Sequence, residues 1–91
     1  MQLNINQMDL NMSEKYIRVE TSDNGEIVCI HANKNGIEYL IKSLNSLLDA
    51  RIKCPDDVVL MTPEWGGDSL SNDTPSDSSI LVNTLKIYRW E

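Results

Sequence analysis

The chain has 91 residues, which allows one domain with a thin hydrophobic core. Its net charge of −6 argues against direct binding to nucleic acid or to an anionic membrane, and favours a basic partner. No apolar run approaches the roughly 18 residues of a membrane span and no signal-peptide pattern opens the chain, so we expect a cytoplasmic protein with a single domain over residues 1–91.

The first third of the chain predicts an arm followed by a β-hairpin. Residues 1–13 alternate loosely between apolar and polar types, which predicts an edge strand or a partly ordered arm. Residues 16–32 contain Asn24-Gly25, the dipeptide that a two-residue type I′ turn requires. That turn pairs the apolar residues on one face and leaves Arg18 opposite His31 on the other. The predicted apolar pairs are Thr21 with Val28, Val19 with Ile30, and Ile17 with Ala32.

A long amphipathic helix is predicted from Asn35 to Arg51. Asn35 is the expected N-cap, Glu38 completes a capping box with it, and Arg51 lies in the expected last turn. Its apolar residues form one stripe on a 3.6-residue period, which we expect to face the core. The stripe contains Ile37, Leu40, Ile41, Leu44, Leu47 and Leu48.

The C-terminal half predicts two further strands, at residues 57–61 and 80–90, on either side of a long loop at 62–79. If Leu85 and Ile87 face the helix, Tyr88 and Trp90 lie on the opposite, open face of the sheet. The predicted fold is therefore α+β, with one amphipathic helix packed on a mainly antiparallel sheet of four or five strands. The predicted order is strand, strand, helix, strand, strand.

The acidic residues are concentrated in this C-terminal half. Between Cys54 and Leu85 there are six acids and no Lys or Arg, whereas the rest of the chain holds eight acids and eight bases. This acidic segment contains Asp56, Asp57, Glu64, Asp68, Asp73 and Asp77. A solvated loop without a partner is the simpler interpretation, and an interaction surface is the alternative.

The sequence contains no pattern typical of an enzyme. Its one histidine, His31, cannot complete a zinc site with Cys29 and Cys54 at ordinary ligand spacings, and both cysteines are expected to be free thiols. No serine lies in a nucleophile elbow, and the Gly66-Gly67 pair lacks the Lys and the following helix of a phosphate-binding loop. We expect no catalytic residue, no metal and no cofactor.

The loop sequence around Trp65 is the strongest candidate for a binding site. Pro63 fixes the turn out of the preceding strand, and Gly66-Gly67 allows backbone conformations that other residues rarely adopt. Trp65 either folds back as a lid over the sheet or anchors an interface, because Trp, Tyr and Arg dominate binding hot spots.

Three stretches of the chain resemble the immunity protein 32 family of bacterial polymorphic toxin systems. They are NKNGIEYLIKSLNSLL, DDVVLMTPEWGGDSL and LKIYRW, within residues 32–90. Proteins of this family bind a secreted toxin and protect the producing cell and its siblings. The third strand of the family carries two alternating histidines, whereas this chain has Asp57 and Val59. The motif carried over consists of Pro63, Glu64, Trp65, Gly66 and Gly67.

The resemblance and the acidic segment together predict an immunity protein of a contact-dependent inhibition system. We expect its partner to be a basic toxin domain with nuclease activity. We do not expect it to bind nucleic acid or a membrane. We expect a monomer, with a dimer as the alternative. The expected binding residues are Glu64, Trp65, Gly66, Gly67, Asp68, Asp73, Asp77, Tyr88 and Trp90. The alternative function is a small structural or regulatory module that associates with itself through the aromatic residues or a free strand edge.

Overall fold

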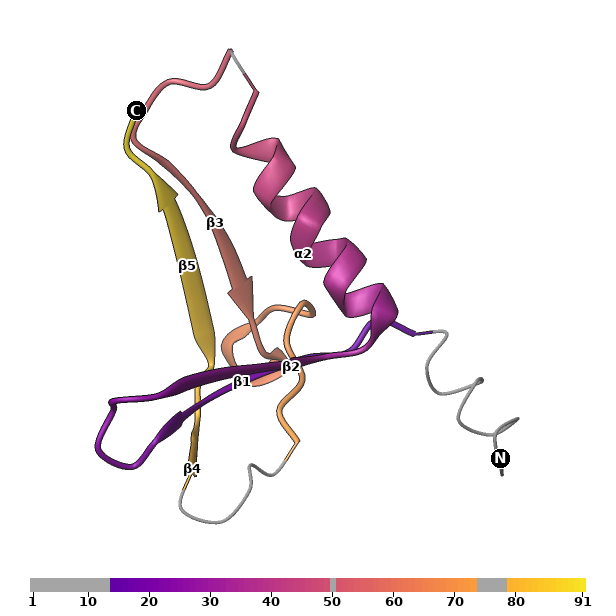
Figure 1. The fold of residues 1–91 in the computed structure, drawn as a ribbon. Helices are drawn as coiled ribbons and strands as arrows, with labels where there is room; N and C mark the ends of the chain where they lie inside the picture. The colour runs from indigo at the N-terminus through magenta and orange to yellow at the C-terminus, as the bar shows by residue number, and fades with distance from the viewer. Residues whose placement is uncertain (1–13, 50, 74–78) are drawn as a thin grey trace.

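The computed structural model describes residues 14–49, 51–73 and 79–91, so the predicted arm at 1–13 lies outside the described residues. Within these residues the fold is α+β, as predicted, with one α-helix and two antiparallel sheets (Figure 1). In chain order, the described elements are β1 (Ile17–Ser22), β2 (Val28–Ala32), α2 (Lys34–Ser46), β3 (Asp56–Met61), the 3₁₀ helix η1 (Pro63–Trp65), β4 (Ser79–Leu81) and β5 (Thr84–Arg89).

The β1–β2 hairpin has the predicted register. Val19 faces Ile30, Ile17 faces Ala32, and Arg18 faces His31. The turn itself is wider than predicted, because the last hydrogen-bonded pair joins Ser22 N to Ile27 O at 2.9 Å. Gly25 has a φ of 75°, the left-handed conformation that glycine adopts without a steric penalty. A four-residue loop centred on the same dipeptide preserves the pairing that the two-residue turn predicts.

The predicted C-terminal strand at 80–90 is wrong, because it is divided between two sheets. β4 pairs with β1, in a sheet of order β2-β1-β4, whereas β5 pairs with β3 in a separate two-stranded sheet. The break lies at Val82 and Asn83. Val82 N donates to Val19 O at 2.9 Å, and the side chain of Asn83 accepts a 2.7 Å hydrogen bond from the fully buried Thr62 hydroxyl. These contacts turn the chain from one sheet into the other.

The helix begins two residues earlier than predicted. Its N-cap is Asn33, whose Oδ1 accepts hydrogen bonds from Gly36 N at 2.7 Å and from Tyr16 N at 3.0 Å. Asn35 therefore lies inside the helix, and Glu38 is too far along to complete a capping box. Asn33 is the cap because β2 ends one residue before it, and its side chain joins the helix N-terminus to the start of β1.

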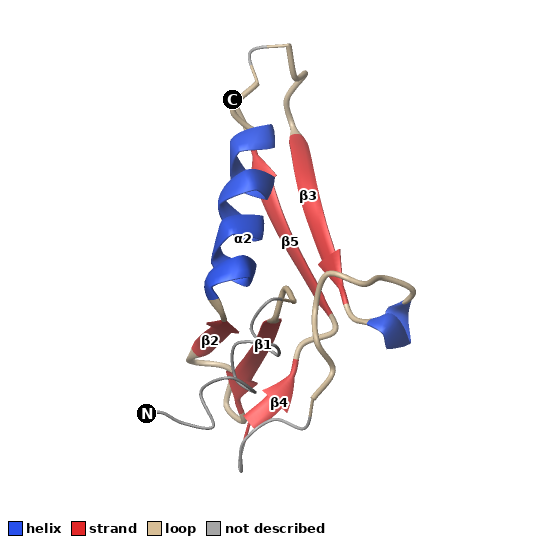
Figure 2. Cartoon of the chain, turned by 90° about the vertical axis from the view of Figure 1, so that its right-hand side faces the viewer, coloured by secondary structure: helices blue, strands red, loops and turns tan. Residues whose placement is uncertain are grey.

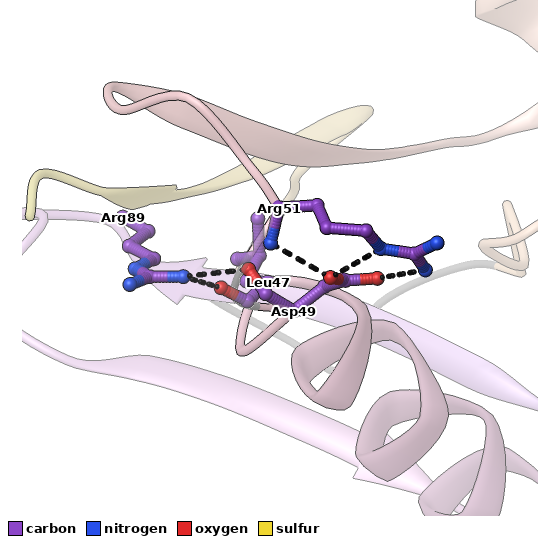
Figure 3. Close-up of polar contacts among 4 residues, drawn as sticks. All are labelled: Leu47, Asp49, Arg51 and Arg89. Atoms are coloured by element: carbon purple, nitrogen blue, oxygen red, sulfur yellow. Dashed lines mark hydrogen bonds and ion pairs between the residues drawn. The ribbon is translucent and has the colours of Figure 1, made fainter.

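The helix also ends earlier than predicted, at Ser46 (Figure 3). A guanidinium nitrogen of Arg89 donates to the backbone oxygens of Leu47 and Asp49, at 2.7 and 3.2 Å. These bonds satisfy two carbonyls of the kind that a helix end leaves without partners. Arg51 was predicted in the last turn but lies beyond the helix, where it forms an ion pair with Asp49 at 2.7 Å. The paired Arg51 lowers the pKa of Asp49 through its side-chain and backbone hydrogen bonds.

The predicted apolar stripe of the helix does not face the core as a unit. Leu47 is buried and Leu40 packs against the core cluster, but the other four members are 44–73 % exposed. Gly36 accounts for this rotation, since a Cβ at that position would overlap the carbonyl oxygen of Tyr16 and lie 2.9 Å from Ile17 Cγ1. The helix therefore packs its glycine side against β1. The exposed residues are Ile37, Ile41, Leu44 and Leu48.

The core is small and lies between the two sheets. It consists of Ile17 and Val19 from β1, Leu60 from β3, and Leu70, with partly buried residues of α2, β3 and β5 packed around them. No helix among the described residues is long and apolar enough to cross a membrane.

The polar face of the β1–β2 hairpin is partly shielded from solvent. Glu20 is only 4 % exposed, and its carboxylate lies 3.4 Å from Arg18 Nη2 and 3.3 Å from His31 Nε2. The two cysteines are free, as predicted, with Cys54 exposed and Cys29 half-buried.

Candidate functional site

The segment after β3 folds into a short, fixed projection. Thr62 accepts hydrogen bonds at its backbone oxygen from Trp65 N and from Gly67 N, both at 3.0 Å. Gly66 N donates to Pro63 O at 3.0 Å, and Gly66 has a φ of 93°, which an L side chain rarely adopts. The sequence therefore builds η1 from proline at its start and a left-handed glycine at its end.

The chain after η1 returns across the end of β3. A Cβ on Gly67 would lie 2.7 Å from both Cβ and O of Met61, so only glycine allows this approach. Met61 O accepts from the backbone nitrogens of Ser69 and Leu70, and Leu70 is 2 % exposed in the core. Ser71 N then donates to Ile17 O at 2.6 Å. The described part of the predicted loop is thus held to both sheets.

Trp65 projects from this loop into solvent. Its exposed fraction is 60 %, and Glu64 and Asp68 beside it are also exposed. The structure therefore does not support the interpretation in which Trp65 folds back as a lid over the sheet. An exposed indole held on a fixed turn is the arrangement expected of an interface anchor.

Within the described residues, the carboxylates of Glu64 and Asp68 form no ion pair with a cation. The ion pairs among the described residues involve Glu20 and Asp49 as acids, and none of them involves Glu64 or Asp68. Lys15 donates to the backbone oxygen of Asp68, at 3.3 Å, rather than to its carboxylate. These charges therefore remain available to an external partner.

Asp73 is exposed and is hydrogen-bonded to the Tyr16 side chain. Burial raises the pKa of Tyr16, and this hydrogen bond to the Asp73 carboxylate raises it further. Asp77, the last predicted binding residue of the loop, lies outside the described residues.

Tyr88 and Trp90 form a second exposed group. Their rings stack with centroids 5.9 Å apart and planes 20° apart, and they are 49 % and 70 % exposed. Both lie on the open face of the β3–β5 pair, as predicted. Arg89 pairs with Asp56 and Thr84 with Met61, so the stacked rings and Trp65 lie toward opposite ends of a six-residue ladder. At about 3.3 Å per residue, that ladder is roughly 17 Å long.

The open face contains two further residues that were not predicted as binding residues. Asp57 faces Tyr88 and Val59 faces Lys86 across the ladder, and Val59 is 41 % exposed. Alternation along β3 places both side chains on the face opposite Leu60. This period-two pattern is present in the sequence, and it could have assigned them to the same surface as Tyr88.

The exposed groups at the candidate site are carboxylates and aromatic rings. In residues 14–49, 51–73 and 79–91, no group of three or more His, Cys, Asp and Glu side chains could hold a metal ion. What the surface offers is unpaired carboxylates beside exposed aromatic rings.

Comparison of the sequence with protein-family models and curated proteins, and of the fold with solved structures, finds no match. The resemblance to the immunity protein 32 family therefore stays a prediction that depends on the motifs quoted above.

Proposed function

We propose that the chain is an immunity protein that binds and neutralises a cognate secreted bacterial toxin in the cytoplasm of the producing cell. The observation that carries this proposal is the fixed projection at Trp65, with its ring 60 % exposed between two exposed carboxylates, Glu64 and Asp68. These residues lie in the part of the sequence that resembles the family most specifically.

Electrostatics explains why such a surface suits a toxin that cleaves nucleic acid. A nuclease presents a basic cleft to phosphates, and carboxylates on an inhibitor can occupy the same positions. Complementary charge also raises association rates, toward about 10⁸–10⁹ M⁻¹s⁻¹ at low salt, which favours rapid capture of an incoming toxin. The net charge of −6 belongs to the acidic segment, since the rest of the chain is balanced.

The proposed contact begins at the η1 projection and extends along the open face of the β3–β5 pair. Trp65 supplies an anchor at one end that the partner would bury, and the stacked Tyr88 and Trp90 supply a second anchor at the other. Asp57 adds a carboxylate beside Tyr88. The length of roughly 17 Å fits within an interface of standard size, which covers about 800 Å² on each partner.

The first experiment identifies the partner by affinity capture from the native strain, together with the product of the neighbouring reading frame. Binding of that toxin domain is then measured for a variant with Glu64→Gln, Asp68→Asn, Asp73→Asn and Asp77→Asn. We expect slower association and a weaker salt dependence than for the unmodified protein. Trp65→Ala should instead raise the dissociation rate, since apolar anchors act after encounter.

The matched control removes the same kind of charge from the β1–β2 turn, by Asp23→Asn and Glu26→Gln. Both residues are exposed and lie outside the acidic segment. An affinity that is unchanged in the four-acid variant, or reduced equally in the control, would contradict the proposed binding surface. Loss of growth protection in the four-acid variant alone would support it.

A second candidate function is self-association of a structural module through the aromatic pair. The stacking and exposure of Tyr88 and Trp90 favour it, because two such surfaces could bury each other. A dimer that dissociates on replacing both rings with Ala, in a protein that binds no toxin domain, would favour this candidate.

A further inference from the structure

The exposed side of α2 carries a regular aliphatic seam. Ile37, Ile41 and Leu44 lie in α2, and Leu48 lies in the turn just after it. They follow one another at spacings of four, three and four residues, and their exposed fractions are 48, 53, 44 and 73 %. This spacing is that of a helix that packs against a second helix. The adjacent, glycine side of α2, about 100° around the helix, already packs against β1, so the seam is a second apolar side of the same helix.

The strand that precedes the helix is also exposed. β2 is an edge strand of its sheet in the part of the chain that the structure describes, and its only strand neighbour there is β1. Val28 and Ile30 are 60 and 49 % exposed, although Val19, which faces Ile30, is fully buried. β2 contains neither Pro nor Lys, the residues that commonly protect free edges.

The two elements that carry these exposed residues are neighbours in the structure. Figure 2 shows α2 and β2 together along one side, with β5 and β3 toward the other. We name this side the β2–α2 face and define it by its exposed aliphatic residues: Val28, Ile30, Ile37, Ile41, Leu44 and Leu48.

The size of the β2–α2 face indicates that it is covered in the native protein. Six aliphatic residues exposed by about half leave on the order of 600 Å² per chain. This is at the upper end of the largest apolar patches on monomers, which are often functional, and it approaches the 800 Å² per partner of a standard interface.

Charge favours a second copy of this chain as the partner. From residue 27 to residue 48 there are one Glu and two Lys, in a protein with a net charge of −6. Two acidic chains can therefore meet here without bringing their acidic segments into contact. A stripe of aliphatic residues beside a free strand edge is also self-complementary, as a two-fold interface requires.

We propose that the β2–α2 face is the interface of a symmetric homodimer. In it, α2 packs antiparallel against α2 of the second copy, with the two-fold axis near the middle of the seam, between Ile41 and Leu44. β2 of each copy then lies toward the C-terminal end of the other copy's α2. Each copy keeps Trp65 and the open face of the β3–β5 pair on its other side. The dimer thus presents two separate acidic surfaces.

The test measures the mass of the full chain in solution by sedimentation over a concentration series. We expect twice the chain mass of 10.3 kDa for the unmodified protein. Ile41→Lys and Ile41→Glu, each folded by circular dichroism, should weaken the dimer about 100-fold, since each change occurs twice in one interface. An equimolar mixture of the two variants should regain the dimer, because the charges near the axis become opposite.

The matched control is Lys42→Glu, which places a charge change on an exposed position of the same helix outside the seam. If the Ile41 variants do not fold, Leu48→Lys gives the same test at the most exposed seam position. A monomer at every concentration, as expected if residues 1–13 or another protein covers the face, would overturn the proposal. So would a dimer that tolerates the seam variants but dissociates on Trp90→Ala.

Discussion

Gly36 is the position where one added methyl group tests the packing of the helix most directly. Its Cβ would overlap the carbonyl oxygen of Tyr16 and lie 3.0 Å from the carbonyl carbon. That carbonyl also accepts a 3.2 Å hydrogen bond from Asn33 N, so it cannot move without disturbing the link between β1 and the helix N-terminus.

The magnitude follows from two opposing effects of Gly36→Ala. Alanine in place of glycine stabilises an unpacked helix by about 1 kcal/mol. Inserting a group into a filled contact costs about 1–3 kcal/mol, and the upper part of that range applies because the obstacle is backbone rather than a flexible side chain. We therefore expect a net loss of about 1–2 kcal/mol in the free energy of unfolding, which is a large fraction of the stability of a domain this small.

The assay is urea unfolding of the purified protein, followed by circular dichroism. Asn45→Ala is the matched control, because Asn45 is exposed on the same helix and should show only a small gain in helix propensity. If Gly36→Ala were about 1 kcal/mol more stable than the unmodified protein, α2 would not approach β1 as described, and the rotation of its apolar stripe would have no explanation.

Three further predictions concern single side chains. Arg89→Leu should lower the free energy of unfolding by about 1.5–3 kcal/mol in urea titrations, because two carbonyls just beyond the helix end lose a charged donor. Arg51→Leu removes an exposed ion pair and should change the free energy of unfolding little, so equal losses would argue against the role of Arg89 at the helix end. Asn33→Ala should cost about 1–2 kcal/mol by the same measurement, since its oxygen caps the helix and also accepts from Tyr16 N. Burial and the hydrogen bond to Asp73 raise the pKa of Tyr16 above its ordinary value of 10.0. The protonated Tyr16 side chain therefore contributes stability that is complete below pH 10 and is lost as the pH rises through the folded-state pKa. Tyr16→Phe should remove this alkaline loss of stability in thermal melts.

The local sequence pattern was sufficient to predict the structure where the interacting residues are close together in the chain. The hairpin register follows from Asn24-Gly25 and the alternation around it, and a change of turn width did not alter it, because both loops are centred on the same dipeptide. The helix itself follows from its periodicity. The loop at Trp65 was correctly placed after a strand, since proline and paired glycines interrupt regular structure.

Features set by distant contacts could not be read from the sequence. The rotation of α2 depends on how closely Gly36 approaches Tyr16, and a glycine inside a helical pattern does not show which residue it will touch. The division of the last strand depends on Asn83 meeting Thr62, twenty-one positions earlier. The separation of Trp65 from Tyr88 depends in turn on which strands pair, because β3 and β5 form their own sheet.

The two-residue connection between β4 and β5 has a consequence for how the protein is made. β3 has no strand partner until Arg89 has been synthesised, and β1 waits for β4 across almost sixty residues of chain. Both sheets are therefore completed by one stretch, residues 79–89, so neither sheet among the described residues is complete until that stretch has been synthesised.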